Sequence, residues 1–288
     1  AGTVHVVPRH APRHPLTSVA WEWTALPWHA RRFELVHLPT YPPTPALRGR
    51  VVYTLHDMVW LRHPQWQSRG GRLYYRRVAR RALSRVELVA VSQAVAQELA
   101  EELDLTAHVI PNGVHPLPEV EPEVRDRPYL LSVGAVEPRK NLPRLVEGYR
   151  ASGLAGQVDL VLVGRSAWGE MPAGVEWLGA VDDRRLAALY RGATAVVSAS
   201  LYEGFGLPVA EALSVGAPVV CSSIAAYRDL TDGHARLFDP LSTSSIAEAL
   251  RDAAAGLPQP PAELATRWSW ARCAAEHREL YTRLLGAV

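Results

Sequence analysis

The sequence predicts an α/β protein built from two doubly wound domains with parallel sheets. Short runs of β-branched and apolar residues alternate with amphipathic helical patterns, which is typical of parallel sheets covered on both faces by helices. The chain has 288 residues, 48% of them hydrophobic, which is enough for one large or two medium-sized domains, and we expect two. The predicted strands are residues 51–55, 88–92, 129–133, 158–163, 194–198 and 218–221.

A linker separates the two predicted domains near residue 120. Residues 116–128 (PLPEVEPEVRDRP) contain four prolines and six charged residues, which interrupt the alternation of strands and helices. We therefore expect an N-terminal domain over residues 1–118 and a C-terminal domain over residues 119–267. A helical segment over residues 268–288 could pack back on the N-terminal domain.

The composition argues against several classes of protein. With 31 Lys and Arg against 29 Asp and Glu, the net charge of +2 is too small for the broad basic surface of a nucleic-acid-binding domain. Two cysteines, Cys221 and Cys273, are too few for a disulfide framework or a cysteine-based zinc site, and they suit a reducing compartment. No apolar run approaches the ~20 residues of a membrane span. We therefore expect a cytoplasmic protein with no nucleic-acid partner.

The loop after the strand at residues 194–198 is the strongest candidate for a ligand site, because ligands of open parallel sheets bind beyond the carboxyl ends of the strands. It leads into a helix that we expect to begin at Pro208 and to end before Gly216. Gly204 and Gly206 allow backbone N–H groups to converge on a phosphate at the start of this helix. The helix end contributes only ~0.3–1 kcal/mol toward one anionic group, so side-chain cations are also needed.

Arg139 and Lys140 are the candidate cations. They lie in the loop after the strand at residues 129–133, which would open onto the same edge of a parallel sheet. Arg can bind a diphosphate with a bidentate fork and Lys as a point charge. The alternative, two solvated cations in a turn, stays open from these residues alone.

Glu203 and Glu211 belong to the same loop and helix, and their carboxylates could face one pocket at two depths. A carboxylate accepts hydrogen bonds from both hydroxyls of a vicinal diol. In a nucleotide-sugar, ribose and hexose offer such diols on opposite sides of the diphosphate. The alternative is an exposed helix glutamate and a turn residue, but the nearby glycines and proline favour a functional role.

At these positions the sequence resembles the retaining glycosyltransferase family 4. The stretch EGFGLPVAE has the spacing of that family's E-x7-E signature, and its EPRKN loop is similar to that of one subgroup. The resemblance follows in order along nearly the whole chain, through VVYTLHD, AVSQAVAQEL, VIPNGV, LSVGAVEPRKNL, LVLVG, WLGAVDDRRLAALYRGA and WSWARCAAEHRELY. It implies the GT-B fold, in which an acceptor-side and a nucleotide-sugar-binding Rossmann-like domain face a cleft.

The resemblance also assigns roles to residues. Lys140 with Arg139 would bind the donor diphosphate, Glu211 the ribose and Glu203 the transferred sugar, while residues 178–181 would hold the base mostly through the backbone. The expected donor-binding residues are Gly134, Arg139, Lys140, Gly164, Leu178, Val181, Glu203, Gly204, Phe205, Gly206, Leu207 and Glu211. The expected catalytic residues are His56, Asp57, Glu203 and Lys140.

His56 and Asp57 follow a predicted strand of the first domain and correspond to the polar position that faces the donor sugar in this family. We expect one of the two to contact the reacting centre. The alternative for His56 is a structural histidine, which is the more common role for a single histidine.

Two departures from the family pattern are visible. Ala135 stands where many members carry an arginine, so we expect the Arg139–Lys140 pair to replace it. The first strand and its glycine-rich loop have no counterpart at the N-terminus. We expect either an incomplete sequence or an unusual first domain that lacks its first strand.

The expected reaction is a front-face displacement from a UDP, GDP or dTDP sugar to a hydroxyl of a glycan, a lipid-linked molecule or a small molecule. The departing diphosphate oxygen takes the acceptor's proton, so that catalysis is mostly positioning and charge stabilisation. The scheme needs no metal or other cofactor, and the sequence contains neither a D-x-D pair nor an H-E-x-x-H motif. The subgroup suggests a mannosyltransferase that uses GDP-mannose.

Three other functions fit the sequence less well. Val209 stands where the third glycine of a G-x-G-x-x-G dinucleotide motif would fall, which disfavours a nicotinamide dehydrogenase. A nucleotide-sugar 2-epimerase shares the fold, but the complete E-x7-E pattern weighs against it. A non-catalytic nucleotide-sugar-binding protein would bind the donor without turnover.

A basic helix is predicted over residues 72–81. One of its faces carries Arg72, Arg76, Arg77, Arg80 and Arg81. A solvated face is the simpler interpretation. The alternative is contact with an anionic membrane or a lipid-linked acceptor, which would place the protein at the inner face of the membrane.

Overall fold

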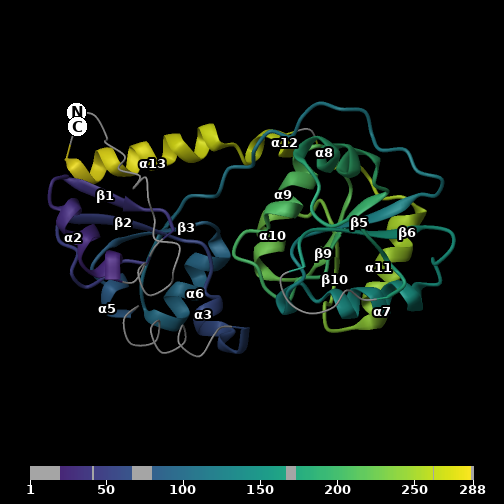
Figure 1. Cartoon of the computed structure of the whole chain (residues 1–288), viewed down its shortest axis with the longest axis horizontal. Coiled ribbons are helices and arrows are strands. Elements are labelled where there is room, and N and C mark those ends of the chain that lie inside the picture. Colours follow the sequence, from purple (N-terminus) through teal and green to yellow (C-terminus); the bar gives the residue numbers. More distant parts are fainter. Residues whose placement is uncertain (1–19, 41, 67–79, 167–172, 262, 287–288) are drawn as a thin grey trace. The chain divides into compact units, whose positions relative to one another are not determined.

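The computed structural model describes residues 20–40, 42–66, 80–166, 173–261 and 263–286 (Figure 1). The chain forms two compact units. Unit 1 comprises Ala1–Val91, Val95–Ile110 and Ala274–Val288, and unit 2 comprises Ser92–Ala94 and Pro111–Cys273. Residues 1–19, where the sequence offers no counterpart of the family's first strand, and most of the predicted basic helix lie outside the described residues.

Unit 1 contains a four-stranded parallel sheet in the order β1-β2-β3-β4. The core strands β2 and β3 are buried almost throughout, which is expected of strands covered on both faces. The strands are β1 (Leu35–Leu38), β2 (Arg50–Leu55), β3 (Glu87–Ala90) and β4 (His108–Val109). The helices are α2 (Ala25–Ala30), α3 (Val59–Arg62), α5 (Arg80–Leu83), α6 (Gln93–Leu103) and α13 (Trp270–Leu285), with a 3-10 turn η1 (Pro64–Trp66).

The C-terminal part of α13 packs in unit 1. The Tyr281 hydroxyl hydrogen-bonds to Nδ1 of His37 on β1, and the ring of His277 stacks on that of His37 with 5.2 Å between centroids. Nε2 of His37 in turn lies 2.8 Å from the Thr54 hydroxyl on β2. These contacts fasten the end of the chain to two strands of the first sheet.

Unit 2 contains a six-stranded sheet in the order β10-β9-β8-β5-β6-β7, with every pair parallel. Numbered from β5, this is the 3-2-1-4-5-6 order of doubly wound nucleotide-binding domains, and the order reverses between β5 and β8. The strands are β5 (Tyr129–Val133), β6 (Asp159–Val163), β7 (Glu176–Trp177), β8 (Ala195–Ser198), β9 (Val219–Ser222) and β10 (Arg236–Phe238).

Helices cover both faces of the second sheet. Figure 1 shows α7 and α11 on one side of this sheet and α8, α9 and α10 on the other. Alternate strand residues such as Leu130, Leu160 and Val197 form one buried cluster with Leu145 of α7 and Ile246 of α11. The helices are α7 (Leu142–Ser152), α8 (Asp183–Gly192), α9 (Leu207–Ser214), α10 (Ala225–Thr231), α11 (Thr243–Ala255) and α12 (Leu264–Arg267), with a 3-10 turn η3 (Pro138–Lys140). The predicted fold class of two parallel-sheet α/β domains is confirmed.

Candidate active site

The candidate site lies where the strand order of the second sheet reverses. The loop after β5 carries η3, and the loop after β8 leads into α9, so both open at the carboxyl ends of adjacent parallel strands. The Leu201 N–H donates to the Arg139 carbonyl across 2.7 Å and joins the two loops. Ligands of doubly wound sheets bind at this kind of reversal.

Glu203 is the centre of a compact charge cluster. Its Oε1 accepts from Lys140 Nζ at 2.6 Å and from the Ser200 hydroxyl at 2.9 Å, and its Oε2 accepts from Arg139 Nη1 at 2.6 Å. Arg139 also donates through Nε and Nη2 to both carboxylate oxygens of Glu137, at 3.1 and 3.0 Å. The structure thus brings three of the predicted site residues into direct contact.

The cluster stays ionised because its charges balance. Burial alone would raise the pKa of Glu203, but the charges of Lys140 and Arg139 outweigh burial and hold this pKa below its usual value. Burial likewise opposes the charge of Arg139, yet Glu203 and Glu137 raise its pKa. The side chains of Lys140 and Glu203 are only 9% and 8% exposed, so salt screens this pair weakly.

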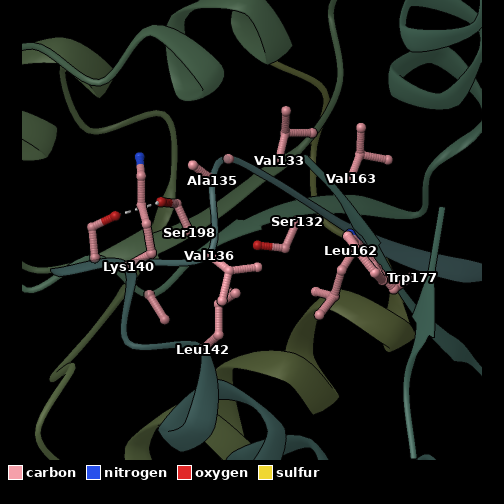
Figure 2. A pocket seen from close by; sticks show the side chains of 13 residues that line it. Ser132, Val133, Ala135, Val136, Lys140, Leu142, Leu162, Val163, Trp177 and Ser198 are labelled. Carbon is pink, nitrogen blue, oxygen red and sulfur yellow. Dashed lines mark hydrogen bonds between the residues drawn. The ribbon is translucent and has the colours of Figure 1, made fainter. Parts of the chain in front are cut away.

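Two glycines let the ends of β5 and β6 approach each other. Gly134 and Gly164 have φ of +151° and +146°, and a Cβ on Gly164 would lie 1.9 Å from the Gly134 carbonyl oxygen. Beside them, a pocket is lined by Lys140, Ala135, Trp177 and other residues at the strand ends (Figure 2). A side chain at Gly164 would therefore prevent the backbone approach, whereas a Cβ on Gly134 would lie 3.2 Å from Cε of Lys140.

The loop before α9 is largely buried. The helix begins at Leu207, one residue before the predicted start, with Gly206 at φ +99° as its N-cap. A Cβ on Gly206 would lie 2.4 Å from Cε1 of Tyr227. Gly204 and Phe205 are buried, and the Phe205 ring meets Trp268 edge to face with 5.6 Å between centroids.

Glu211 lies one turn inside α9 and accepts a 2.8 Å hydrogen bond from the hydroxyl of Tyr190 on α8. Burial raises the pKa of Glu211; the Tyr190 hydrogen bond and the charge of His115 lower it, and Asp183 raises it. The direct contacts of Tyr190 with Glu211 and of Ser200 with Glu203 were not predicted. Tyr190 lies on a different helix from Glu211, so a local pattern cannot pair them. Ser200 and Glu203 lie in one loop, where no spacing rule predicts a contact.

The predicted base-binding segment follows β7 directly. The Leu178 N–H donates to the Leu162 carbonyl at 3.0 Å, and the Gly164 N–H donates to the Gly179 carbonyl at 2.9 Å. Trp177 Nε1 donates to the Gly164 carbonyl at 2.9 Å. These bonds hold the segment at the end of β6; Val181 is partly buried.

His56 and Asp57 lie just beyond β2 in unit 1. The Pro39 carbonyl can only accept, so His56 Nε2 donates to it across 2.7 Å. Asp57 Oδ1 accepts from the Val59 N–H at 3.1 Å, at the start of α3. Both residues therefore have a local structural role, and their approach to the donor sugar stays a prediction.

Within the parts of the chain that the structure describes, no group of three or more His, Cys, Asp or Glu side chains is arranged to hold a metal ion. None of the helices described here is both long and apolar enough to cross a bilayer.

Comparison with known proteins decides the family. The profile described as glycosyl transferases group 1 matches residues 116–267. The chain belongs to this family. A second profile, glycosyltransferase family 4, matches residues 1–116. The resemblance inferred from the motifs is thereby confirmed, whereas the EPRKN subgroup stays a prediction.

A curated relative agrees with the family assignment. The chain is 31% identical over 180 residues to the O-antigen chain mannosyltransferase B of Escherichia coli, an alignment that covers 54% of this chain and 46% of that protein. The chain thus spans less than half of this relative's length.

Solved structures show the same fold. Sucrose-phosphate synthase from Thermosynechococcus elongatus superposes with a TM-score of 0.74 at 20% identity, over 97% of this chain and 81% of that one. HepE from Anabaena, in complex with UDP and glucose, gives 0.68 at 19% identity, over 94% and 84%. The GT-B fold of the chain is therefore confirmed.

Proposed function

We propose that this protein is a retaining glycosyltransferase that moves a hexose from a nucleotide-diphosphate sugar to a hydroxyl acceptor. The observation that carries the proposal is the cluster of Arg139, Lys140 and Glu203 at the strand-order reversal between β5 and β8. It combines two cations suited to a diphosphate with a carboxylate suited to sugar hydroxyls. Because the chain belongs to the family of glycosyl transferases group 1, we assign this cluster to the donor site.

In the proposed reaction, Arg139, Lys140 and the N–H groups at the start of α9 bind the diphosphate and stabilise the charge that it gains on leaving. The bond from the anomeric carbon to the diphosphate oxygen breaks. On the same face, the acceptor oxygen bonds to that carbon, and its proton moves to the departing oxygen. Glu203, with His56 or Asp57, orients the sugar, so these residues act by positioning.

The donor and acceptor are proposed by class. The relative from Escherichia coli is named as a mannosyltransferase, which supports a mannosyl donor, and the structural neighbour from Anabaena holds UDP. We keep UDP, GDP and dTDP sugars as candidates, with GDP-mannose first. Arg139 and Lys140 can donate directly to the diphosphate oxygens, so we propose a reaction that needs no metal. The two cysteines suit a reducing compartment, so we propose that the reaction takes place in the cytoplasm.

A turnover assay on the full-length protein tests the proposal. Each candidate donor is incubated with the protein, and release of the nucleoside diphosphate is measured with and without hydroxyl acceptors. We expect one donor to be consumed and Lys140→Ala to lower the rate by about 10²–10³-fold. Arg251→Ala, which removes an exposed cation on α11, should leave the rate unchanged.

Two outcomes would contradict the proposal. Donor binding without any release of nucleoside diphosphate would favour a non-catalytic nucleotide-sugar-binding protein. Conversion of the donor into its C2 epimer in place of transfer would favour a 2-epimerase.

A further inference from the structure

Each acid of the E-x7-E stretch has a fully buried tyrosine behind it. Tyr190 of α8 and Tyr227 of α10 both have 0% of their surface exposed. Neither tyrosine belongs to the stretch, and they approach it from two different helices. Glu203 and Glu211 are thus each connected to a hydroxyl that solvent does not reach.

The contact behind Glu211 is direct. The Tyr190 hydroxyl donates to Oε2 at 2.8 Å. No hydrogen bond to Oε1 is recorded among the residues that the structure describes. A diol can therefore approach Oε1 while Tyr190 fixes the rotation of the carboxylate.

The contact behind Glu203 runs through serines. The Tyr227 hydroxyl lies 2.6 Å from the Ser198 hydroxyl and 3.3 Å from the Ser200 hydroxyl. Glu203 is ionised and can only accept, so Ser200 must donate to it and is left to accept from Tyr227. The chain of hydroxyls is thereby oriented toward the carboxylate, and each donor polarises the next.

The ring of Tyr227 has a second contact, with the loop itself. The glycine at the N-cap of α9, Gly206, is so close that a Cβ there would lie 2.4 Å from Tyr227 Cε1. Tyr227 therefore supports the loop with its ring and Glu203 through its hydroxyl.

Packing alone does not explain these two hydroxyls. A buried hydroxyl costs free energy unless it forms a hydrogen bond, and phenylalanine would fill the same space without that cost. The Tyr190 hydroxyl is directed at Glu211, and the Tyr227 hydroxyl is connected to Glu203 through Ser200. A role in the site accounts for tyrosine at both positions.

We propose that Tyr190 and Tyr227 are positioning residues of the donor site, Tyr190 for the carboxylate that binds ribose and Tyr227 for the carboxylate that binds the transferred sugar. This inference rests on the proposed function. It divides the support of the site into two parts that can be disturbed separately. Ribose binding depends on Tyr190, and sugar orientation depends on Tyr227.

The pH dependence gives a readout that a purely structural tyrosine would not affect. The groups that act on Glu211 are Tyr190 and Asp183 from α8 and His115 from the segment before β5. The Tyr190 hydrogen bond lowers the pKa of Glu211, so Tyr190→Phe raises it. Because ribose binding needs the ionised carboxylate, the loss of affinity on acidification should begin at a higher pH in the variant.

The experiment compares Tyr190→Phe, Tyr227→Phe and Tyr149→Phe in the full-length protein. Tyr149 is a matched control, since its buried hydroxyl donates to the Val158 carbonyl on the opposite face of the sheet. Calorimetric titrations with UDP, GDP and dTDP give the affinity for the nucleotide without its sugar. Steady-state transfer from the matching nucleotide-sugar gives kcat and KM.

We expect Tyr190→Phe to weaken nucleoside diphosphate binding about tenfold, as for one lost hydrogen bond to a charged group. In a Glu211→Ala background the same change should have no further effect. Tyr227→Phe should change nucleoside diphosphate affinity less than twofold but lower kcat about tenfold. Tyr149→Phe should change neither.

Several results would overturn the inference. The inference fails if Tyr190→Phe keeps wild-type affinity, or if its effect adds to that of Glu211→Ala. It also fails if Tyr227→Phe keeps the wild-type kcat. Loss of a cooperative thermal transition in either variant would overturn it by showing a structural role. If none of the three nucleotides binds the wild-type protein, the proposed function fails first.

Discussion

At the scale of single residues, the carboxylate of Glu203 is the most constrained group of the site. Three donors fix its carboxylate: Lys140, Arg139 and Ser200. A carboxylate held in this way keeps the buried Lys140 and the partly buried Arg139 in place. Any ligand that binds these cations must therefore share them with Glu203.

Replacing Glu203 with glutamine should reduce both stability and activity. The change leaves Lys140 without its counter-charge in a site that water hardly reaches, and breaking such a buried pair costs about 3–5 kcal/mol. We expect a loss near the lower value, because Arg139 keeps Glu137 as a partner. Urea unfolding measures it, and Glu137→Gln, at a more exposed carboxylate, should cost under ~1 kcal/mol. Equal losses in the two variants would contradict the special role of Glu203.

The ion pair of Lys140 and Glu203 also predicts how stability depends on pH. The folded-state pKa of Glu203 lies below its usual value, so its ionised form stabilises the protein above the unfolded-state pKa of ~4.3. This contribution disappears as the pH falls from that value through the lower folded-state pKa. The difference in unfolding free energy between wild type and Glu203→Gln should shrink over this range. A difference that grew with acidification would contradict the assigned direction.

At the scale of elements, the site depends on how closely the ends of β5 and β6 approach. Gly164 has a positive φ and would place a Cβ within 1.9 Å of the Gly134 carbonyl oxygen. Because that neighbour is backbone, it cannot rotate away. The close approach is therefore a requirement of the fold at the candidate diphosphate loop.

Gly164→Ala should destabilise the protein by more than ~2 kcal/mol and weaken donor binding, because the clash adds to the strain of a positive φ. Gly156→Ala is the matched control, since it has φ +85° but no atom within 4 Å of an added Cβ. It should cost about 1 kcal/mol and leave binding intact. Thermal unfolding and nucleotide titration measure both effects, and equal costs would show that the contact is unimportant.

Sequence patterns predicted the well-buried strands but missed β1, which is mostly only partly buried, and the short strands β4, β7 and β10. All six predicted runs correspond to strands, and β5 agrees to the residue. The strands β4 and β7 have two exposed residues each, and β10 has three residues, so none offers a periodicity. These strands form by pairing with neighbouring strands of the sheet. A local sequence pattern does not contain that information.

At the scale of the whole molecule, loop positions could be predicted and their partners could not. The parallel topology alone placed Lys140 and Glu203 at one sheet edge. Their 2.6 Å contact comes from the close approach of the loops after β5 and β8. The buried hydroxyls of Tyr190 and Tyr227 come from the packing of α8 and α10. No spacing rule encodes either. The motifs thus predicted the charged residues of the candidate site, and the fold shows which side chains contact them.

Membrane contact is a further prediction at this scale. If the basic residues 72–81 bind anionic lipid, the protein should co-sediment with vesicles that contain phosphatidylserine, and the bound fraction should fall as salt screens the charges. Vesicles of phosphatidylcholine are the control. Binding that is insensitive to salt would contradict an electrostatic contact.

The central claim is that a nucleotide-sugar binds at the strand-order reversal with its ribose on Glu211. A thermal-shift panel of UDP, GDP and dTDP sugars on the full-length protein tests it most directly, because a ligand at 100 times its Kd stabilises the folded state by about 2.7 kcal/mol. One donor should raise Tm, Glu211→Ala should abolish the shift, and Glu147→Ala, an exposed glutamate of α7, should retain it. No shift with any donor, or an unchanged shift in Glu211→Ala, would contradict the claim.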